Sequence, residues 1–196
     1  MTGQDKLDRL EGLNQKIQTC RSCELWKTRT NPVVGEGNPN SVLMIVAQAP
    51  GYREDEEGRM FIGPSGIKLD ELLENAQVQR KSIYMTNLVK CALPHNRKLK
   101  PGEITDCSQY LDQEINIVEP EVISTLGYHP AKYIFGKYGL TEKLDYSEIC
   151  GVTFKADDKT IYPLRHPATL LYNPRKEAEI KENYKRLKAF LEKYPR

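Results

Sequence analysis

Short apolar runs alternate with amphipathic segments along most of this 196-residue chain. The run 42–46, VLMIV, is rich in β-branched residues and bounded by turn residues, which is typical of a strand buried on both faces. Further strands are predicted at 82–87, 122–126 and 160–164. Helices are predicted at 4–19, from beyond Ser65 to Ala76, at 104–118, at 130–138 and from about 175 onward. Strands that alternate with helices favour one α/β domain over residues 1–196, with a central, mainly parallel four-stranded sheet flanked by helices.

Two of these helices have a more specific prediction. Leu7, Leu10, Leu13 and Ile17 recur at helical spacing, so the first helix is expected to be amphipathic and to end near the first cysteine pair. The second helix is expected to use Ser65 as its N-cap, with apolar positions from Ile67 onward.

The composition excludes several classes of protein without indicating a function. No apolar run approaches the roughly 20 residues that span a bilayer, and the first residues lack a signal peptide's apolar stretch. We therefore expect a cytoplasmic protein without a membrane segment. The formal net charge is only +2, so contact with nucleic acid has to come from a local basic face. The segment 92–102, ALPHNRKLKPG, is the candidate for that face.

Four of the five cysteines are spaced as candidate metal ligands. Cys20 and Cys23 form a C-x2-C pair, Cys91 follows the second predicted strand, and Cys107 lies near the start of a predicted helix. Reducing cytosol keeps thiols free, which favours metal binding over disulfides. Four thiolates suit zinc or an iron–sulfur cluster, and unconnected buried cysteines are the alternative. Cys150 stands apart and is expected to be an incidental thiol.

Polar residues follow three predicted strands where each strand ends. The loop after the first strand carries Glu54 and Asp55, two carboxylates that can activate a water, although such pairs also decorate surfaces. Asn87 ends the second strand and His166 follows the last one. An amide can match the edge of a pyrimidine, and a neutral histidine can donate to an oxygen that gains negative charge. Since ligands of parallel sheets bind beyond the carboxyl ends of the strands, these residues predict one ligand site.

Taken together, these motifs resemble the family 4, iron–sulfur type uracil-DNA glycosylases, from about Cys20 to Pro174. The family pattern is Gly-Glu-(Ala/Gly)-Pro-Gly with Glu-Asp and Phe-x-Gly-x-x-Gly, then Thr-Asn-x-x-Lys-Cys, then His-Pro-Ala. The matching segments here are 47–51, 54–55, 61–66, 86–91 and 166–168. The resemblance implies a DNA-repair hydrolase that flips uracil out of single- or double-stranded DNA and hydrolyses its N-glycosidic bond, leaving an abasic site.

The resemblance also implies roles for individual residues. Phe61 would stack on the base, Asn87 would read its N3 and O4 edge, and His166 would donate to O2. Glu54 or Asp55 would hold the attacking water. The implied uracil-binding residues are Gln48, Ala49, Pro50, Phe61, Asn87 and His166. The implied ligands of one [4Fe-4S] cluster are Cys20, Cys23, Cys91 and Cys107.

Contact with DNA is expected through a wedge and a set of cations. Leu170 falls where related enzymes place a side chain that fills the space vacated by the base. The candidates for phosphate contacts are Lys90, Arg97, Lys98, Lys100, Arg165 and Arg175. We expect a monomer, with a sliding clamp as a candidate further partner.

One departure from the family pattern keeps an alternative open. Gln48 stands where the family usually has Glu, and Ala47 where it has Gly. The alternative is a catalytically altered iron–sulfur module that binds DNA with the same fold. Two further alternatives are a relative that traps its abasic product through a histidine in a basic insert, and a zinc-stabilised nucleotide-binding enzyme. The stretch 162–166 shows no such insert.

Overall fold

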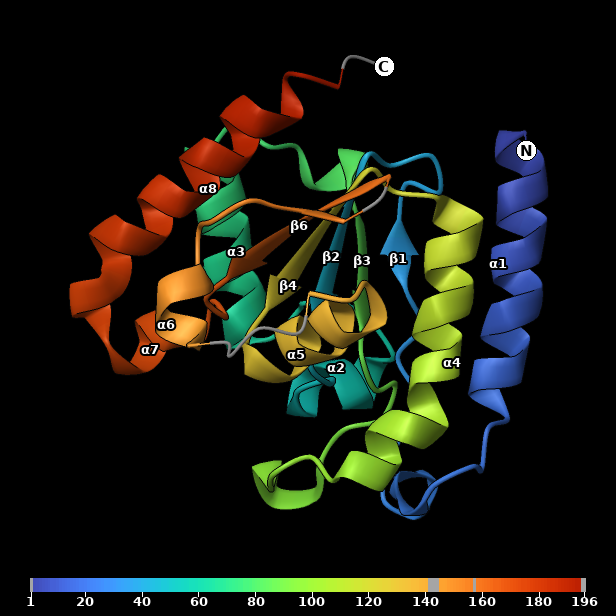
Figure 1. The fold of residues 1–196 in the computed structure, drawn as a ribbon. Helices are drawn as coiled ribbons and strands as arrows, with labels where there is room; N and C mark the ends of the chain where they lie inside the picture. The colour runs from blue at the N-terminus through green and yellow to red at the C-terminus, as the bar shows by residue number, and fades with distance from the viewer. Residues whose placement is uncertain (1, 141–144, 157, 195–196) are drawn as a thin grey trace.

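The structure, a computed structural model, describes residues 2–140, 145–156 and 158–194. Its centre is a six-stranded sheet in the order β1-β3-β2-β4-β6-β5, with helices on both sides (Figure 1). The strands are β1 Glu36–Gly37, β2 Leu43–Ala47, β3 Tyr84–Asn87, β4 Val122–Leu126, β5 Phe154–Ala156 and β6 Lys159–Leu164. The four inner strands are parallel, and β1 and β5 pair antiparallel at the two edges. The predicted parallel sheet is confirmed as the centre, and two short edge strands extend it.

The helices of the described residues alternate with these strands. The α-helices are α1 Gly3–Gln18, α2 Tyr52–Glu57, α3 Pro64–Asn75, α4 Pro101–Val118, α5 Tyr128–Lys137, α6 Tyr146–Ile149, α7 Thr169–Tyr172 and α8 Glu177–Leu191. Short 3-10 segments are η1 Glu24–Lys27, η2 Arg80–Ser82, η3 Pro94–Asn96 and η4 Pro174–Lys176. None of the helices in this part of the chain is long and apolar enough to cross a membrane.

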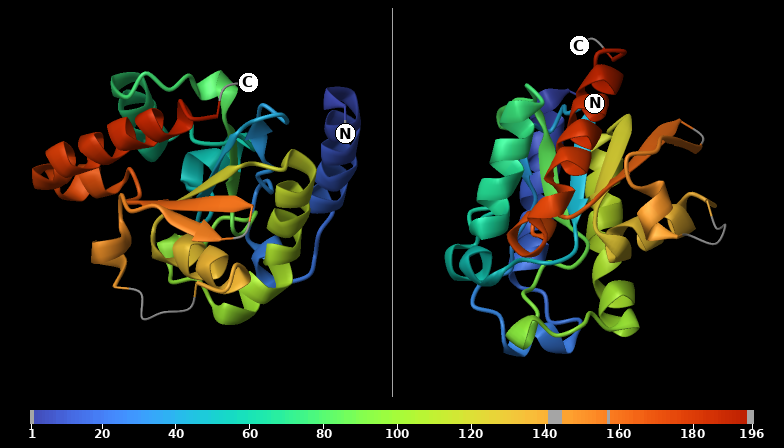
Figure 2. Two further views of the ribbon diagram at one scale, coloured as in Figure 1. Left: turned by 45° about the horizontal axis from the view of Figure 1, so that its top comes forward. Right: turned by 90° about the vertical axis from the view of Figure 1, so that its left-hand side faces the viewer.

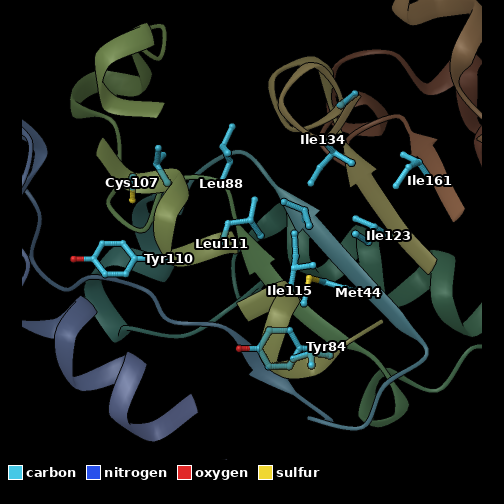
Figure 3. Packing of buried hydrophobic residues seen from close by; sticks show 14 of the residues in the cluster. Met44, Tyr84, Leu88, Cys107, Tyr110, Leu111, Ile115, Ile123, Ile134 and Ile161 are labelled. Atoms are coloured by element: carbon cyan, nitrogen blue, oxygen red, sulfur yellow. The ribbon is translucent and has the colours of Figure 1, made fainter. Parts of the chain in front are cut away.

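Each face of the sheet carries its own apolar core because side chains along a strand alternate between the two faces. Met44 and Val46 of β2 belong to the core beneath α1, α4 and α5, part of which is drawn in Figure 3. Leu43 and Ile45 of the same strand belong to the core beneath α3 and α8. The two layers of helices lie on opposite sides of the sheet in both views of Figure 2. A strand apolar on both faces is therefore enclosed, as its sequence predicted.

One prediction about a helix detail is wrong, and two apolar positions lie outside the core. The N-cap of α3 is Gly63 and not Ser65, because Pro64 occupies the first helical position, where its missing N–H costs nothing. Ile67 is 58% exposed and Leu7 is 48% exposed, so each apolar side chain points away from the core that its neighbours fill. Helical spacing alone did not identify these two outward positions.

The order of the strands determines where a ligand can enter. The chain passes from β2 to β3 on one side and then crosses back to β4 on the other side of β2. The carboxyl ends of β2 and β4 therefore flank a topological switch point, the usual ligand site of open parallel sheets.

Candidate active site

A hollow of about 300 Å³ opens at this edge of the sheet, beside the switch point. All six predicted uracil-binding residues line it: Gln48, Ala49, Pro50, Phe61, Asn87 and His166. They come from the end of β3, from the segments that follow β2 and β6, and from the segment before α3. The sheet thus brings together residues that lie far apart in the sequence.

Glu54 is fixed in the wall of the hollow. Its side chain is buried, and its Oε1 accepts a hydrogen bond from the backbone N–H of Gly63 at 2.7 Å. A Cβ atom at Gly51 would lie 2.6 Å from Glu54 Oε2, and one at Gly63 would lie 3.1 Å from each carboxylate oxygen. The absence of side chains at these two glycines therefore makes room for the carboxylate beside the hollow.

Asp55, the neighbouring carboxylate, is not part of the wall. Its Oδ2 accepts from the backbone N–H of Thr30 at 2.9 Å, and the Asn31 side chain donates to the backbone oxygen of Asp55 at 3.0 Å. These bonds fasten α2 to the segment before β1. Consecutive residues of a helix point in different directions, so of the two carboxylates only Glu54 lines the hollow.

Phe61 presents its ring to the hollow from an unusual backbone conformation. Its φ is 52°, in the left-handed region that costs a non-glycine residue about 1–3 kcal/mol. A Cβ atom at Gly66 would lie 1.9 Å from the Phe61 carbonyl oxygen, so glycine is required for α3 to start against this peptide. The ring centroids of Phe61 and His166 are 6.4 Å apart, with 33° between the ring planes.

Asn87 is the last residue of β3 and is almost fully buried. Its side-chain nitrogen donates to Met60 Sδ at 3.2 Å. A thioether is a weak acceptor, so the amide keeps its capacity to donate to a ligand oxygen. Next to it, the backbone N–H of Val89 donates to the Gln48 carbonyl at 3.0 Å, which joins the loops after β2 and β3.

His166 is held as a neutral hydrogen-bond donor. The backbone N–H of Ala168 donates to His166 Nδ1 at 3.2 Å, so the proton of the neutral ring sits on Nε2. Desolvation lowers the pKa of His166 to about 4, and the nearby Glu54 opposes this shift only in part. The imidazole is therefore uncharged at neutral pH and offers its Nε2–H.

The four predicted cysteine ligands line a second, smaller cavity. Cys20 and Cys23 follow α1, Cys91 follows β3 and Cys107 lies on α4. Cys91 and Cys107 are buried and the first pair is half-buried. Cys150 is not part of this cavity, and its thiol donates a hydrogen bond to the Tyr146 carbonyl at 3.2 Å. The fold therefore gathers four of the five thiols in one place.

Backbone and side-chain N–H groups point at three of these sulfurs. Arg29 Nη1 donates to Cys91 Sγ at 3.1 Å, and the backbone N–H of Lys90 donates to Cys107 Sγ at 3.3 Å. The backbone N–H of Ser22 reaches Cys20 Sγ at 3.5 Å. Four thiols with N–H donors fit the kind of donor set that holds an iron–sulfur cluster. Among the described residues, no three Cys, His, Asp or Glu side chains are arranged as a site for a single metal ion.

Burial shapes the titration of the deeper thiols. It raises the pKa of Cys107 to about 12, against the positive charge of Lys90. It also raises the pKa of Cys91, although Arg29 lowers it in part. Thiols in such surroundings become thiolates when a bound metal supplies positive charge.

The prediction that Lys90 contacts phosphate is wrong. Its side chain is buried, with 1% of the residue exposed, and its Nζ lies 2.6 Å from Glu114 Oε2. The same nitrogen donates to Thr86 Oγ1 at 2.5 Å and to the Asn87 carbonyl at 2.9 Å. A loop lysine would normally keep its charge in water, but here a buried carboxylate on α4 compensates it.

The other predicted cations differ in how free they are. Arg97 lines the hollow and pairs with Glu103 through both terminal nitrogens. Arg165 Nε donates to Glu179 Oε1 at 2.7 Å. Lys98, Lys100 and Arg175 are exposed on the surface.

Leu170, the predicted wedge, lies in the short helix α7. It is half-buried and packs against the core between α3, α8 and the sheet. The next two side chains are more open, since Leu171 is 41% exposed and Tyr172 is 86% exposed. A wedge role for Leu170 therefore requires it to leave part of this packing.

Several residues of the hollow were not predicted from the sequence. They are Met60, Ser65, Leu93, Asn96, Leu126 and Gly127. Leu126 and Gly127 end β4 and follow it, so the strand-end rule that selected Asn87 could have found them. Met60 and Leu93 are apolar loop residues that carry no such signal.

The fold and the hollow define the class of protein: an α/β protein whose ligand site lies at the switch point of a parallel sheet. In that site an aromatic ring, a buried amide and a neutral histidine converge.

Comparison with known proteins gives the family. The family model "Uracil DNA glycosylase superfamily" matches residues 34–193. A type-4 uracil-DNA glycosylase of Sulfurisphaera tokodaii is 40% identical over 93% of this chain and 84% of its own length. Those of Saccharolobus solfataricus and Archaeoglobus fulgidus are 34% and 33% identical, over 96% and 92% of this chain and 89% and 92% of theirs. The chain belongs to the type-4 uracil-DNA glycosylases within this superfamily.

Proposed function

We propose that this protein removes uracil from DNA by hydrolysing the bond between N1 of the base and C1′ of the deoxyribose. The observation that carries the proposal is the convergence of Phe61, Asn87 and His166 on one hollow. A base flipped out of the helix needs a stacking surface, a group that reads its edge, and a donor for the charge that develops as it leaves. Each of the three residues supplies one of these.

Recognition of uracil rests on Phe61 and Asn87. The ring of Phe61 stacks on the base, and the Asn87 amide donates to O4 and accepts from N3–H. Cytosine presents the opposite pattern at both positions, an amino donor and an unprotonated nitrogen. Because Asn87 is almost fully buried, a mispaired amide has no water to compensate it. The backbone of Gln48, Ala49 and Pro50 approaches O2 from the other wall.

Catalysis rests on His166 and Glu54. As the C1′–N1 bond breaks, its electron pair moves onto the uracil ring, and the His166 Nε2–H donates to O2 and stabilises the resulting anion. Water adds to C1′ and transfers a proton toward Glu54, whose Oε1 already accepts from Gly63, so Oε2 is the oxygen proposed to hold the water. The proton taken from the water passes through solvent to the uracil anion and restores the Glu54 carboxylate, so the products are free uracil and an abasic site. Asp55 holds the segment 30–31 in this proposal and does not meet the water.

The Gln48 departure does not remove a group that this mechanism needs. Gln48 lines the hollow through the loop after β2, while the carboxylate comes from α2. The three relatives named above are glycosylases by name, which favours the enzyme over a quiet DNA-binding module. No lysine lines the hollow within the described residues, so we propose simple hydrolysis without a covalent intermediate.

We further propose that Cys20, Cys23, Cys91 and Cys107 hold one [4Fe-4S] cluster. The cluster would supply four metal–thiolate bonds that join the segment after α1 to the turn after β3 and to α4. The N–H groups of Arg29, Lys90 and Ser22 would stabilise the charge on the ligand sulfurs. Its role in this proposal is structural.

The DNA is proposed to lie across the mouth of the hollow, with Lys98, Lys100 and Arg175 on phosphates. Arg97 and Arg165 would reach phosphates by exchanging their present carboxylate partners. Leu170 remains the proposed wedge. We propose that residues 1–196 form one domain, and that the protein is a cytoplasmic monomer with a sliding clamp as a further candidate partner.

The direct test incubates the purified, iron-loaded protein with matched oligonucleotides that contain uracil, cytosine or thymine at one position. Single-stranded and double-stranded forms are treated with alkali, which cleaves abasic sites. We expect cleavage only of the uracil substrates, and no complex trapped by borohydride. An intact uracil oligonucleotide after prolonged incubation with excess protein would overturn the proposal.

A further inference from the structure

The peptide between Met60 and Phe61 supports both groups that are proposed to recognise the base. Phe61 carries the ring and holds a φ of 52°. The Met60 side chain accepts the hydrogen bond from the Asn87 amide at 3.2 Å. A backbone conformation this rarely populated persists only where its surroundings fix it.

Arg80, about twenty residues further along the chain, provides that fixation. Its Nη2 donates to the Met60 carbonyl at 2.7 Å and its Nη1 to the Phe61 carbonyl at 3.3 Å. Nη1 also lies 2.6 Å from Asp70 Oδ1 on α3. The guanidinium therefore ties two consecutive carbonyls to a helix through two nitrogens held in a fixed fork, whereas a lysine has a single nitrogen to place against them.

Arg80 does not line the hollow, but it reaches two residues that do, Met60 and Phe61, through their carbonyl oxygens. Its ion pair with Asp70 is partly exposed, since 32% of the Arg80 side chain and 51% of the Asp70 side chain are accessible to solvent. Such pairs contribute little to stability. The two carbonyl contacts are therefore the better reason for an arginine at this position.

We propose that Arg80 is a positioning residue for base recognition. Its contacts with the Met60 and Phe61 carbonyls set the direction of the Phe61 ring and, through Met60, the place of the Asn87 amide. This inference rests on the proposed function. It adds a specificity-determining residue, on the side of the loop away from the base, to those that line the hollow.

The test compares Arg80→Met with Arg80→Lys and with the control Lys68→Met. Lys68 lies on α3 near Asp70 and pairs with Glu71 at the surface, so its loss removes a similar ion pair without touching the loop. For each variant we would measure the inhibition constant of free uracil, the KM and the saturating rate on a uracil oligonucleotide, and the thermal midpoint.

We expect Arg80→Met to raise the uracil inhibition constant and the KM by on the order of 10- to 100-fold, as a displaced contact does. Arg80→Lys should fall between Arg80→Met and the wild type, because it restores one carbonyl contact. Lys68→Met should match the wild type, and the thermal midpoints of the folded variants should stay close together. Unchanged uracil inhibition in Arg80→Met and Arg80→Lys, with the wild type active, would overturn the inference. A wild type that neither binds nor releases uracil would overturn the proposed function instead.

Discussion

The hollow and the cysteine cavity adjoin the same short stretch after β3, yet they are built in different ways. The hollow is formed by loops at the ends of parallel strands, joined by main-chain bonds such as Val89 N–H to the Gln48 carbonyl. The cysteine cavity lies where the segment after α1 meets the stretch after β3 and the first part of α4. The groups that converge there are thiols, which are weak hydrogen-bond partners. The sheet therefore shapes the first site by itself, whereas in the second the proposed cluster would supply the bonds that join the thiols to one another.

Lys90 belongs to both regions. Its side chain donates to the Asn87 carbonyl at the edge of the hollow, and its backbone N–H donates to Cys107 Sγ in the cysteine cavity. The same side chain forms a buried ion pair with Glu114 on α4. Substitutions in one region, with measurements made on the other, test how far the two sites depend on each other.

The largest effect is expected from Lys90→Met, which leaves Glu114 buried without its cation. Removing one partner of a buried pair costs about 3–5 kcal/mol of stability. Lys98→Met is the matched control, because Lys98 is exposed and its loss should change stability by no more than about 0.5 kcal/mol. The measurement is urea unfolding of the iron-loaded protein. The double variant Lys90→Met with Glu114→Met should recover much of the loss, and equal unfolding free energies for Lys90→Met and Lys98→Met would contradict the structural role.

The second largest effect is expected at His166, where a loss of reaction rate should occur without a loss of stability. His166→Ala removes the donor to uracil O2 and should lower the single-turnover rate by about 10² to 10³. The cluster absorbance and the thermal midpoint should not change, because His166 lies outside the cysteine cavity. A rate within a few-fold of the wild type would place the stabilisation of the leaving uracil elsewhere in the hollow.

Asn87→Ala tests recognition within the hollow. The preference for uracil over cytosine should fall by about 1–3 kcal/mol, because the amide that rejects cytosine is gone. The ratio of single-turnover rates on two oligonucleotides that differ only at this base measures it. Unchanged selectivity would end the edge-reading role of Asn87.

Cys107→Ser tests the cysteine cavity, and its effect on the reaction rate is expected to be smaller than that of the variants in the hollow. Loss of the cluster should loosen the basic loop 92–102 and weaken DNA binding by on the order of 10-fold, about what one charge-assisted contact contributes. The saturating rate should change less than the affinity. Iron content and DNA affinity are measured on the same preparation, with Cys150→Ser as the control that keeps the cluster. Stoichiometric zinc without iron in anaerobically purified wild-type protein would contradict the proposed cluster.

The sequence predicted the parts of the molecule that follow from local pattern and sheet topology. The four inner strands appear as apolar runs, and Glu54, Asn87 and His166 line the hollow near the ends of three of them. Glu54 and Asp55 could not be separated, because their difference depends on glycines at 51 and 63 and on the distant Thr30.

Long-range pairing explains the remaining errors and omissions. Lys90 looks like a surface cation in the sequence, and only the placement of α4 reveals its partner Glu114. Arg80 has no motif of its own, and its contacts depend on the loop before α3. The edge strand β1 spans two residues, too few to show a strand period.

The pH dependence of the single-turnover rate shows whether the hollow keeps His166 neutral and able to donate. The pKa of His166 is lowered from 6.5 to about 4, so the donor form persists as the pH falls through the ordinary histidine range. We expect the rate, measured at saturating enzyme on a uracil oligonucleotide, to pass through pH 6.5 without a step. A step near pH 6.5 in the wild type that is absent from His166→Ala would show that His166 titrates as an exposed histidine and is not held as the neutral donor.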